Sequence, residues 1–195
     1  MNNIAIITAR GGSKRIPKKN IKEFMGKPML AYAIDAALNS EIFDEVMVST
    51  DDFEIAEIAK KFGAKIPFMR SEKTANDFAT TADVLNEVIY EYKKQGINFE
   101  KFCCIYPCTP FLTGEILINA YKKFVASGAD KLTPVVKNSF PIQRAFKINN
   151  NGFLEYREPL NASKRSQDLE PMYHDVGMFY FYKTNKIQSD KIAMY

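Results

Sequence analysis

Short apolar runs alternate along the chain with segments in which apolar side chains recur at helical spacing. Five runs have the pattern of strands buried on both faces: residues 4–9, 45–50, 66–69, 102–106 and 131–136. Four segments between them predict amphipathic helices: residues 28–38, 52–62, 80–92 and 114–125. Repeated alternation of strand and helix predicts an α/β fold with a doubly wound, mostly parallel sheet.

The pattern changes between residues 138 and 172. Residues 146–148 and 153–156 flank the dipeptide Asn151-Gly152, an arrangement typical of a β-hairpin. Residues 176–182 then form a strongly β-prone run. We expect a single domain, residues 1–195, from which residues 138–172 leave the main sheet. Another apolar run begins at residue 192, so we expect the natural chain to continue past Tyr195.

Composition and charge narrow the class of protein. Hydrophobic residues make up 46% and charged residues 26% of the 195 residues, as in ordinary soluble globular proteins. No apolar run approaches the ~20 residues that cross a bilayer, and the dispersed net charge of +4 argues against nucleic acid as a partner. Cys103, Cys104 and Cys108 are too few for a disulfide framework, so we expect reduced thiols in a cytoplasmic protein.

Basic side chains gather once, around Gly11 and Gly12, directly after the first predicted strand: Arg10, Lys14, Arg15, Lys18 and Lys19. Ligands of doubly wound sheets bind outside the carboxyl ends of the strands. Glycine lets a backbone approach a phosphate closely, and Arg and Lys supply the opposite charge. The spacing is neither that of a P-loop nor that of a dinucleotide fingerprint. A phosphate-binding loop is favoured over the alternative, a flexible basic surface loop.

The segment from Ala9 to Asn20 resembles the nucleotide signature of the CMP-sialic acid synthetase (acylneuraminate cytidylyltransferase) family. Five further segments match that family in order: Ser49-Thr50-Asp51, Asp77-Phe78-Ala79-Thr80-Thr81, residues 105–111, residues 165–169 and Gly177-Met178-Phe179-Tyr180. The resemblance covers essentially the whole chain. It implies a Rossmann-like nucleotidyltransferase fold and an enzyme that transfers CMP from CTP to the anomeric hydroxyl of a nine-carbon acidic sugar, releasing pyrophosphate.

The same resemblance implies which residues bind the nucleotide: Arg10, Gly11, Ser13, Lys14, Lys19, Asn20, Arg70, Asp77, Thr80 and Thr81. Arg10 and Lys19 would be catalytic, because they would neutralise the charge that develops as pyrophosphate leaves. For Thr80 and Thr81 an alternative remains, since a helix N-cap and first turn would favour the same residue types.

Departures from the sialic acid enzymes indicate a different acceptor. Tyr106 stands where those enzymes have Gln, and His174-Asp175 replaces an Arg-containing motif. The chain most resembles pseudaminic acid cytidylyltransferases, which implies that its product serves flagellin glycosylation. The expected sugar-binding residues are Tyr106, Arg144, Arg165, Gln167, His174 and Asp175. The alternatives are solvated surface charge for the two arginines and a structural or general-base role for His174.

Other functions stay open: a sialic or legionaminic acid cytidylyltransferase, a sugar-1-phosphate nucleotidyltransferase, or a non-catalytic nucleotide-binding homologue. The family places an Asp-x-Asp pair for Mg²⁺ after the return strand, where this sequence has only Asp190. We therefore expect Mg²⁺ or another divalent cation as cofactor, with its acidic ligands beyond Tyr195. In the family the excursion at residues 138–172 is exchanged between subunits, which implies a homodimer.

Overall fold

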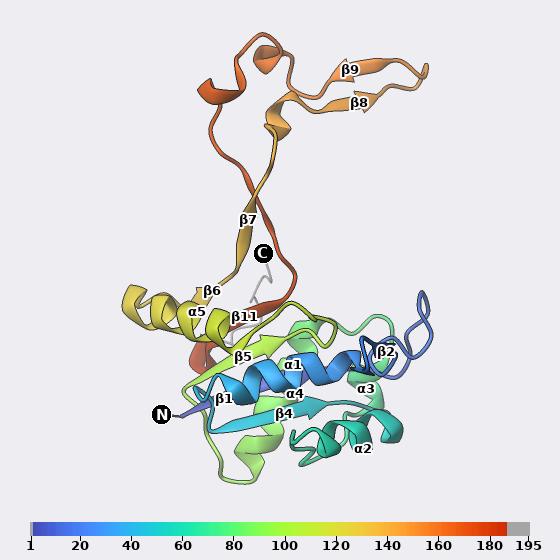
Figure 1. The fold of residues 1–195 in the computed structure, drawn as a ribbon, viewed down its shortest axis with the longest axis vertical. Helices are drawn as coiled ribbons and strands as arrows, with labels where there is room; N and C mark the ends of the chain where they lie inside the picture. Colours follow the sequence, from blue (N-terminus) through green and yellow to red (C-terminus); the bar gives the residue numbers. More distant parts are fainter. Residues whose placement is uncertain (1, 187–195) are drawn as a thin grey trace. The chain divides into compact units, whose positions relative to one another are not determined.

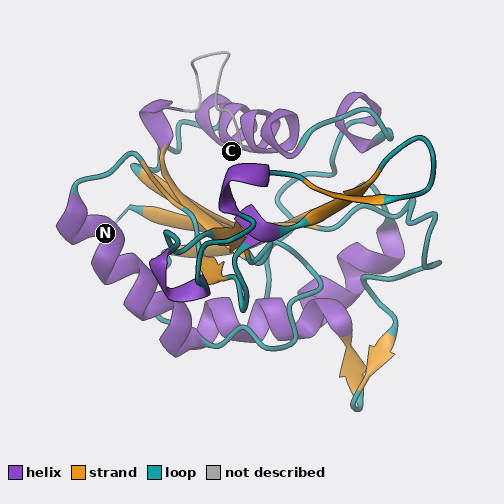
Figure 2. Ribbon diagram, turned by 90° about the horizontal axis from the view of Figure 1, so that it is seen from above, coloured by secondary structure: helices purple, strands orange, loops and turns teal. Residues whose placement is uncertain are grey.

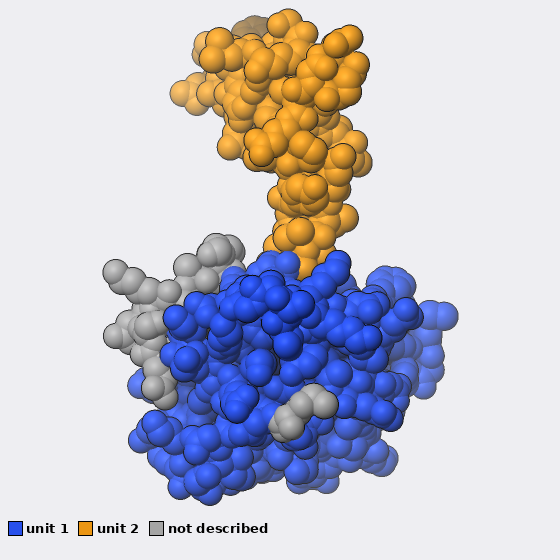
Figure 3. Space-filling model, turned by 90° about the vertical axis from the view of Figure 1, so that its left-hand side faces the viewer, with its two compact units in different colours: residues 1–133, 177–195 blue, residues 134–176 orange. Residues whose placement is uncertain are grey.

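The computed structural model describes residues 2–186. Asp190 and the apolar run that begins at residue 192 lie outside these residues. The chain divides into two compact units, which are coloured separately in Figure 3. The first unit comprises Met1–Thr133 and the residues from Gly177 onward, and the second is Pro134–Val176. The segment 138–172, predicted to leave the main sheet, falls inside the second unit.

The first unit is built on one five-stranded sheet (Figure 1). Its strands, in spatial order, are β4 (Glu45–Ser49), β1 (Asn3–Thr8), β5 (Lys101–Ile105), β11 (Phe179–Lys183) and β6 (Lys131–Leu132). Strand β1 pairs in parallel with β4 and β5, so that Ile6 lies opposite Met47 and Cys104. Strands β11 and β6 add an antiparallel edge. The predicted α/β doubly wound sheet is confirmed, with its parallel part at β4, β1 and β5.

Helices cover both faces of this sheet, as Figure 2 shows from above. Three helices pack on one face: α1 (Met29–Asn39), α2 (Phe53–Lys61) and α5 (Gly114–Ser127). The long helix α4 (Thr81–Lys94) packs on the other. Successive side chains of a strand point to opposite faces, so Ala5 and Ile7 enter the first core and Ile4 and Ile6 the second. A continuous apolar run in β1 follows directly from this double burial. Among residues 2–186, no helix has the length and apolar character needed to cross a membrane.

Proline disrupts two of the predicted strands: one does not form and the other is interrupted. The strand predicted at residues 66–69 is wrong: only an isolated bridge forms, between Met47 and Lys65. Pro67 lacks the N–H that would continue the ladder. The strand predicted at 131–136 is interrupted at Pro134, giving β6 in the first unit and β7 (Val135–Lys137) in the second.

The predicted return strand also begins later than its apolar run suggests. Its first residues are replaced by a turn at Gly177, whose φ of +68° suits glycine, and β11 starts at Phe179. Just before that turn, β10 (Tyr173–Asp175) pairs antiparallel with β7 inside the second unit. Of the predicted run 176–182, Val176 belongs to the second unit and residues 177–182 belong to the first.

The predicted hairpin of the second unit is confirmed. Strands β8 (Phe146–Ile148) and β9 (Leu154–Tyr156) pair antiparallel, and Gly152 has a φ of +83° in the turn. The sequence did not predict several short elements: β2 (Glu23–Phe24), β3 (Lys27–Pro28), helix α3 (Glu72–Ala75), and the 3₁₀ helices Ile142–Arg144, Pro159–Asn161, Ser166–Asp168 and Thr184–Lys186.

Candidate nucleotide site

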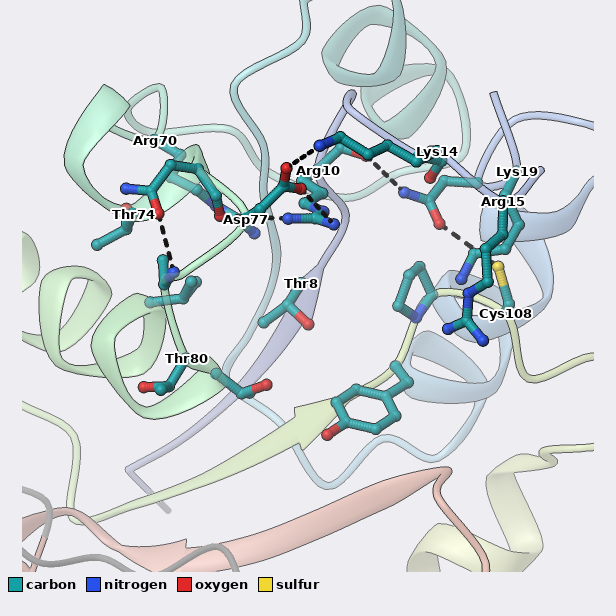
Figure 4. Close-up of a pocket in the computed structure, with 18 of the residues that line it drawn as sticks. Thr8, Arg10, Lys14, Arg15, Lys19, Arg70, Thr74, Asp77, Thr80 and Cys108 are labelled. Carbon is teal, nitrogen blue, oxygen red and sulfur yellow. Dashed lines mark hydrogen bonds and ion pairs between the residues drawn. The ribbon is translucent and has the colours of Figure 1, made fainter. Parts of the chain in front are cut away.

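A pocket of about 660 Å³ opens at the carboxyl ends of the parallel strands. Thr8, the last residue of β1, and Tyr106, which follows β5, both line it. This is where ligands bind in doubly wound sheets. Ten of the predicted site residues line the pocket: Arg10, Ser13, Lys14, Lys19, Asn20, Arg70, Asp77, Thr80, Thr81 and Tyr106. The structure thus brings together residues spread over nearly a hundred positions of the sequence (Figure 4).

The loop after β1 lies close against the start of α2. The Gly11 N–H donates a hydrogen bond of 3.0 Å to the Asp51 carboxylate. A Cβ at Gly11 would lie only 2.7 Å from Asp52 Oδ2, so a larger residue would push the loop away. Gly11 is not among the residues that line the pocket. Its visible contribution is to hold the loop against Asp51, and its predicted nucleotide contact stays a prediction.

Asn20 is buried and ties the loop to its surroundings. Its side-chain Nδ2 donates to the Arg10 carbonyl at 2.8 Å, and its own carbonyl accepts from the Leu30 N–H at 2.8 Å. Its Oδ1 accepts from the Cys108 thiol at 3.4 Å. These contacts link the start of the loop to α1 and to the segment after β5. Asn20 therefore positions the loop, whether or not it also touches a ligand.

The pocket lining is strongly basic. Five basic residues contribute to it, against one acidic residue, Asp77: Arg10, Lys14, Arg15, Lys19 and Arg70. The neighbouring Lys18 pairs instead with Glu54 of α2 at 2.5 Å, and its φ of +52° marks the reversal of the chain there. Figure 4 shows Lys19 and Arg15 together near Cys108, on a different side of the pocket from Arg10 and Lys14. Such a lining suits a small polyanion.

Arg10 and Lys14 both turn toward Asp77 (Figure 4). Arg10 Nη2 lies 3.2 Å from Asp77 Oδ1, and Lys14 forms an ion pair with the other carboxylate oxygen. The hydrogen bond from Lys14 and the charges of Lys14 and Arg10 hold the pKa of Asp77 below its usual value. In this structure a carboxylate thus occupies the cations that would meet a phosphate.

Arg70 is buried and anchored to the end of β4. Its Nε donates to Ser49 Oγ at 3.0 Å and its Nη2 to the Ser49 carbonyl at 2.6 Å. Burial lowers the pKa of the Arg70 guanidinium, an effect opposed by the nearby Asp51 carboxylate. An arginine remains charged under such a shift. Arg70 therefore presents a fixed cation to the pocket.

The N-terminus of α4 meets the pocket at Thr80 and Thr81. Thr80 is the N-cap: its hydroxyl oxygen accepts from the Asp83 N–H at 3.2 Å, and the Asp83 carboxylate accepts from the Thr80 N–H at 2.8 Å. The capping interpretation is therefore confirmed for Thr80. Both threonines also line the pocket, so a nucleotide contact remains a prediction for each.

Tyr106 lines the pocket, and its ring packs edge-on against Tyr180 with 5.6 Å between centroids. The other five predicted sugar-binding residues belong to the second unit: Arg144, Arg165, Gln167, His174 and Asp175. Within that unit, His174 Nδ1 lies 2.9 Å from Asn138 Oδ1, and Arg165 pairs with Asp168 at 2.8 Å. Their predicted role at a sugar remains a prediction.

Asn76 and Arg15 are among the ten lining residues that were not predicted as site residues. The Asn76 carbonyl accepts a hydrogen bond from Arg10 Nη1 at 3.2 Å, and the Asn76 side chain accepts from the N–H groups of Phe78 and Ala79. An Asn four residues before the N-cap Thr80 is a signal for such a turn. Arg15 lies within the basic motif but was given no role. As for a metal, residues 2–186 bring no group of three or more His, Cys, Asp or Glu side chains together as a binding cluster.

Comparison with known proteins identifies the family. Residues 4–192 match the cytidylyltransferase family. This chain belongs to the cytidylyltransferase family. A cytidylyltransferase is a nucleotidyltransferase, so the basic pocket at the sheet edge is the candidate site of an enzyme.

The chain is similar to other cytidylyltransferases over much of its length. The pseudaminic acid cytidylyltransferase of Campylobacter jejuni subsp. jejuni serotype O:2 is 45% identical over 181 residues, 93% of this chain and 78% of that protein. The CMP-N,N'-diacetyllegionaminic acid synthase of Legionella pneumophila is 34% identical over 66% of this chain and 55% of that protein. A solved CMP:2-keto-3-deoxy-manno-octonic acid synthetase complexed with CTP has the same fold, with a TM-score of 0.71 and 23% identity over 96% of this chain and 76% of that chain.

Proposed function

We propose that this enzyme transfers CMP from CTP to the anomeric hydroxyl of pseudaminic acid and releases pyrophosphate. The observation that carries the proposal is the basic pocket at the carboxyl ends of β1 and β5. It occurs in a cytidylyltransferase that is 45% identical to a protein named for this acceptor. Five basic residues around one pocket match the charge of a nucleoside triphosphate.

The chemistry is a displacement at the α-phosphorus of CTP. The anomeric hydroxyl gives up its proton to solvent as its oxygen forms a bond to that phosphorus. The bond from phosphorus to the bridging oxygen of the β-phosphate breaks, and pyrophosphate leaves with the electron pair. The protein contributes positioning and charge. Arg10 and Lys19 line the pocket, and we assign them to the charge that grows on the leaving pyrophosphate.

A divalent cation, Mg²⁺ or an equivalent, belongs to this proposal. When bound, it would offset the negative charge of the triphosphate. Mg²⁺ is usually held by one or two carboxylates together with substrate phosphates. Among residues 2–186 the carboxylate that lines the pocket is that of Asp77, and no ligand of the ion is assigned.

Tyr106 supports the choice of acceptor. Its ring adds apolar surface to the pocket and it keeps one hydroxyl. A pocket for the hydroxylated tail of sialic acid needs several hydrogen-bond partners, whereas pseudaminic acid has a deoxygenated tail and a second acylamino group. The candidate sugar contacts in the second unit are Arg144, Arg165, Gln167, His174 and Asp175. The two arginines have the chemistry to bind a sugar carboxylate.

The second unit supports a homodimer. Eight of its large hydrophobic side chains are more than half exposed: Val135, Phe140, Phe146, Ile148, Phe153, Leu154, Leu160 and Tyr173. Exposed apolar side chains gathered in one small unit mark an interaction surface. We propose that a second copy of the chain covers them and that each second unit serves the sugar site of its partner. Light scattering should give a dimer for the wild type and a monomer for Leu160→Asp; a wild-type monomer with full activity would contradict this.

The same proposal places the enzyme in the cytoplasm. Cys103, Cys104 and Cys108 are all free, as expected of thiols in a reducing compartment.

The function is tested by following pyrophosphate release from CTP with Mg²⁺ and pseudaminic acid. We expect release that depends on the sugar and formation of the CMP-sugar. Release with UTP or CTP and a sugar 1-phosphate instead would favour a sugar-1-phosphate nucleotidyltransferase. Calorimetric binding of CTP without turnover would favour a non-catalytic nucleotide-binding protein.

A further inference from the structure

Glu87 of α4 holds the short helix α3 in place. Its carboxylate accepts three hydrogen bonds, all from the stretch between Ser71 and Thr74. The Ser71 N–H donates to Oε1 at 2.8 Å, and the Ser71 hydroxyl donates to Oε2 at 2.8 Å. The Thr74 hydroxyl donates to Oε2 as well. A single side chain thus accepts from the backbone N–H and hydroxyl of the N-cap Ser71 and from the hydroxyl of Thr74.

Helix α3 joins the two parts of the pocket wall that carry Arg70 and Asp77. It has only four residues, Glu72–Ala75, and so short a helix is not stable by itself. Arg70 comes two residues before it, and Asp77 two residues after its end. Both line the pocket. Arg70 is held separately by Ser49, so a shift of α3 would displace mainly Thr74, Asn76 and Asp77, which also line the pocket.

The hydrogen bonds to Glu87 are strong because their acceptor is ionised. Hydrogen bonds to an ionised acceptor are roughly twice as strong as those between neutral groups. Thr74 is only 6% exposed, so its hydroxyl has little access to water in place of the carboxylate. Partial burial of Glu87 works to raise the pKa of its carboxyl, but the hydrogen bonds from Thr74 and Ser71 and the charge of Arg70 bring that pKa below its usual value. The carboxylate is therefore charged at neutral pH.

Glu87 itself does not line the nucleotide pocket. It lies about two helical turns along α4 from Thr80, on the wall of a separate groove that also includes Ser71 and Thr74. Thr74 also lines the nucleotide pocket, so any influence of Glu87 on the nucleotide passes through α3 or through its charge interaction with Arg70.

We propose that Glu87 is a positioning residue for the nucleotide: by fixing α3 it keeps one wall of the pocket, formed by Thr74, Asn76 and Asp77, in place for CTP. The inference rests on the proposed function, since CTP is the ligand whose binding it sets. Glu87 would affect the binding of CTP and not the transfer of CMP. The backbone of the basic loop is held from its own side, by Asn20 on the Arg10 carbonyl and by Asp51 on the Gly11 N–H, so the chemical step should be spared.

The test is Glu87→Ala, measured by steady-state kinetics and by calorimetric binding of CTP. We expect a rise of about tenfold in both the KM and the Kd for CTP, because hydrogen bonds to a charged group are lost. The value of kcat should stay within about threefold of wild type. Glu87→Gln keeps one side-chain oxygen that can accept from the Ser71 N–H. Its KM and Kd for CTP should therefore lie between those of the wild type and those of Glu87→Ala. Glu91→Ala is the matched control, since Glu91 lies one turn further along α4 and pairs with Lys94 at 2.7 Å.

Ser71→Ala removes one of the three hydrogen bonds from the other side, and Ser71 does not line the nucleotide pocket. We expect it to weaken CTP binding in the same direction, and the double variant with Glu87→Ala should be little worse than Glu87→Ala alone. If Glu87→Ala does not fold, Ser71→Ala still provides the test. Unchanged CTP affinity in these variants would overturn the inference, as would equal losses in kcat and affinity together with a lowered melting temperature. Wild-type turnover is scored separately, so a wild type that binds CTP but releases no pyrophosphate counts against the proposed function alone.

Discussion

Arg10 Nη2 lies 3.2 Å from the carboxylate of Asp77, inside a pocket whose other charged lining residues are all basic. Lys14 pairs with the same carboxylate. The pKa of Asp77 is lowered, so the ion pairs are complete at neutral pH and are lost only as the pH falls through that lowered pKa. At working pH a polyphosphate must therefore compete with Asp77 for these two cations.

Asp77→Asn should consequently bind inorganic pyrophosphate more tightly than the wild type does. We expect a decrease in Kd of about two- to fivefold, because the groups are solvent-exposed and such ion pairs are individually weak. The difference in Kd between the variant and the wild type should shrink below the pKa of Asp77. The wild-type carboxylate is then protonated and uncharged, as the Asn side chain is. Calorimetry at two pH values measures both effects.

The control for this comparison is Asp168→Asn, which removes the partner of Arg165 in the second unit. It should leave pyrophosphate binding unchanged. Weaker pyrophosphate binding by Asp77→Asn would mean that Asp77 organises the cations more than it competes for them.

Arg10→Ala and Lys19→Ala should each lower kcat by about 10²–10³-fold, since each removes a charge that stabilises the leaving pyrophosphate. The fold should survive, because Asn20 holds the loop through the backbone carbonyl of Arg10 and not through its side chain. Lys18→Ala provides the control, since Lys18 pairs with Glu54. Near-normal turnover of both variants at saturating CTP would remove the loop from the mechanism.

Variants of Thr80 and Thr81 distinguish helix capping from nucleotide binding. Thr80→Ala breaks the capping box with Asp83 and should lower the free energy of unfolding by about 1 kcal/mol. Thr81→Ala should leave stability within about 0.5 kcal/mol and raise the KM for CTP several-fold. Urea unfolding and initial-rate kinetics on both variants decide this. Equal loss of stability in the two would show that Thr81 is also structural.

The capping box also has a pH signature. Hydrogen bonds from Thr80 lower the pKa of Asp83. Its contribution to stability is therefore complete above the usual carboxyl pKa and is lost as the pH falls through the lowered value. The difference in unfolding free energy between wild type and Thr80→Ala should shrink in that acidic range.

The main sheet was predictable from sequence because Ile4, Ile6 and their neighbours are buried on both faces, which leaves a continuous apolar run. Strand ends were less predictable, since Pro67 and Pro134 stop pairing inside runs that are otherwise β-prone. Helix α3 gives almost no local signal, because its stability depends on Glu87, 13 residues from Thr74.

The site was predictable as a set of residues but not as a set of contacts. The basic loop follows β1 in the sequence, so its place at the strand ends could be inferred. The hydrogen bond between Asn20 and Cys108 joins positions 88 residues apart, and only the folded chain brings them together. The pairing of Arg10 with Asp77 likewise depends on how the loop before α4 returns to the pocket.

The central claim is that this cytidylyltransferase uses CTP and prefers pseudaminic acid, with Tyr106 lining the acceptor side of the pocket. The most direct measurement is the initial rate of pyrophosphate release with CTP and Mg²⁺, in parallel, for pseudaminic, legionaminic and N-acetylneuraminic acid. The account predicts the highest kcat/KM for pseudaminic acid by at least about tenfold, because mismatched polar groups in a buried pocket are costly. A higher kcat/KM for N-acetylneuraminic acid would contradict the assigned acceptor.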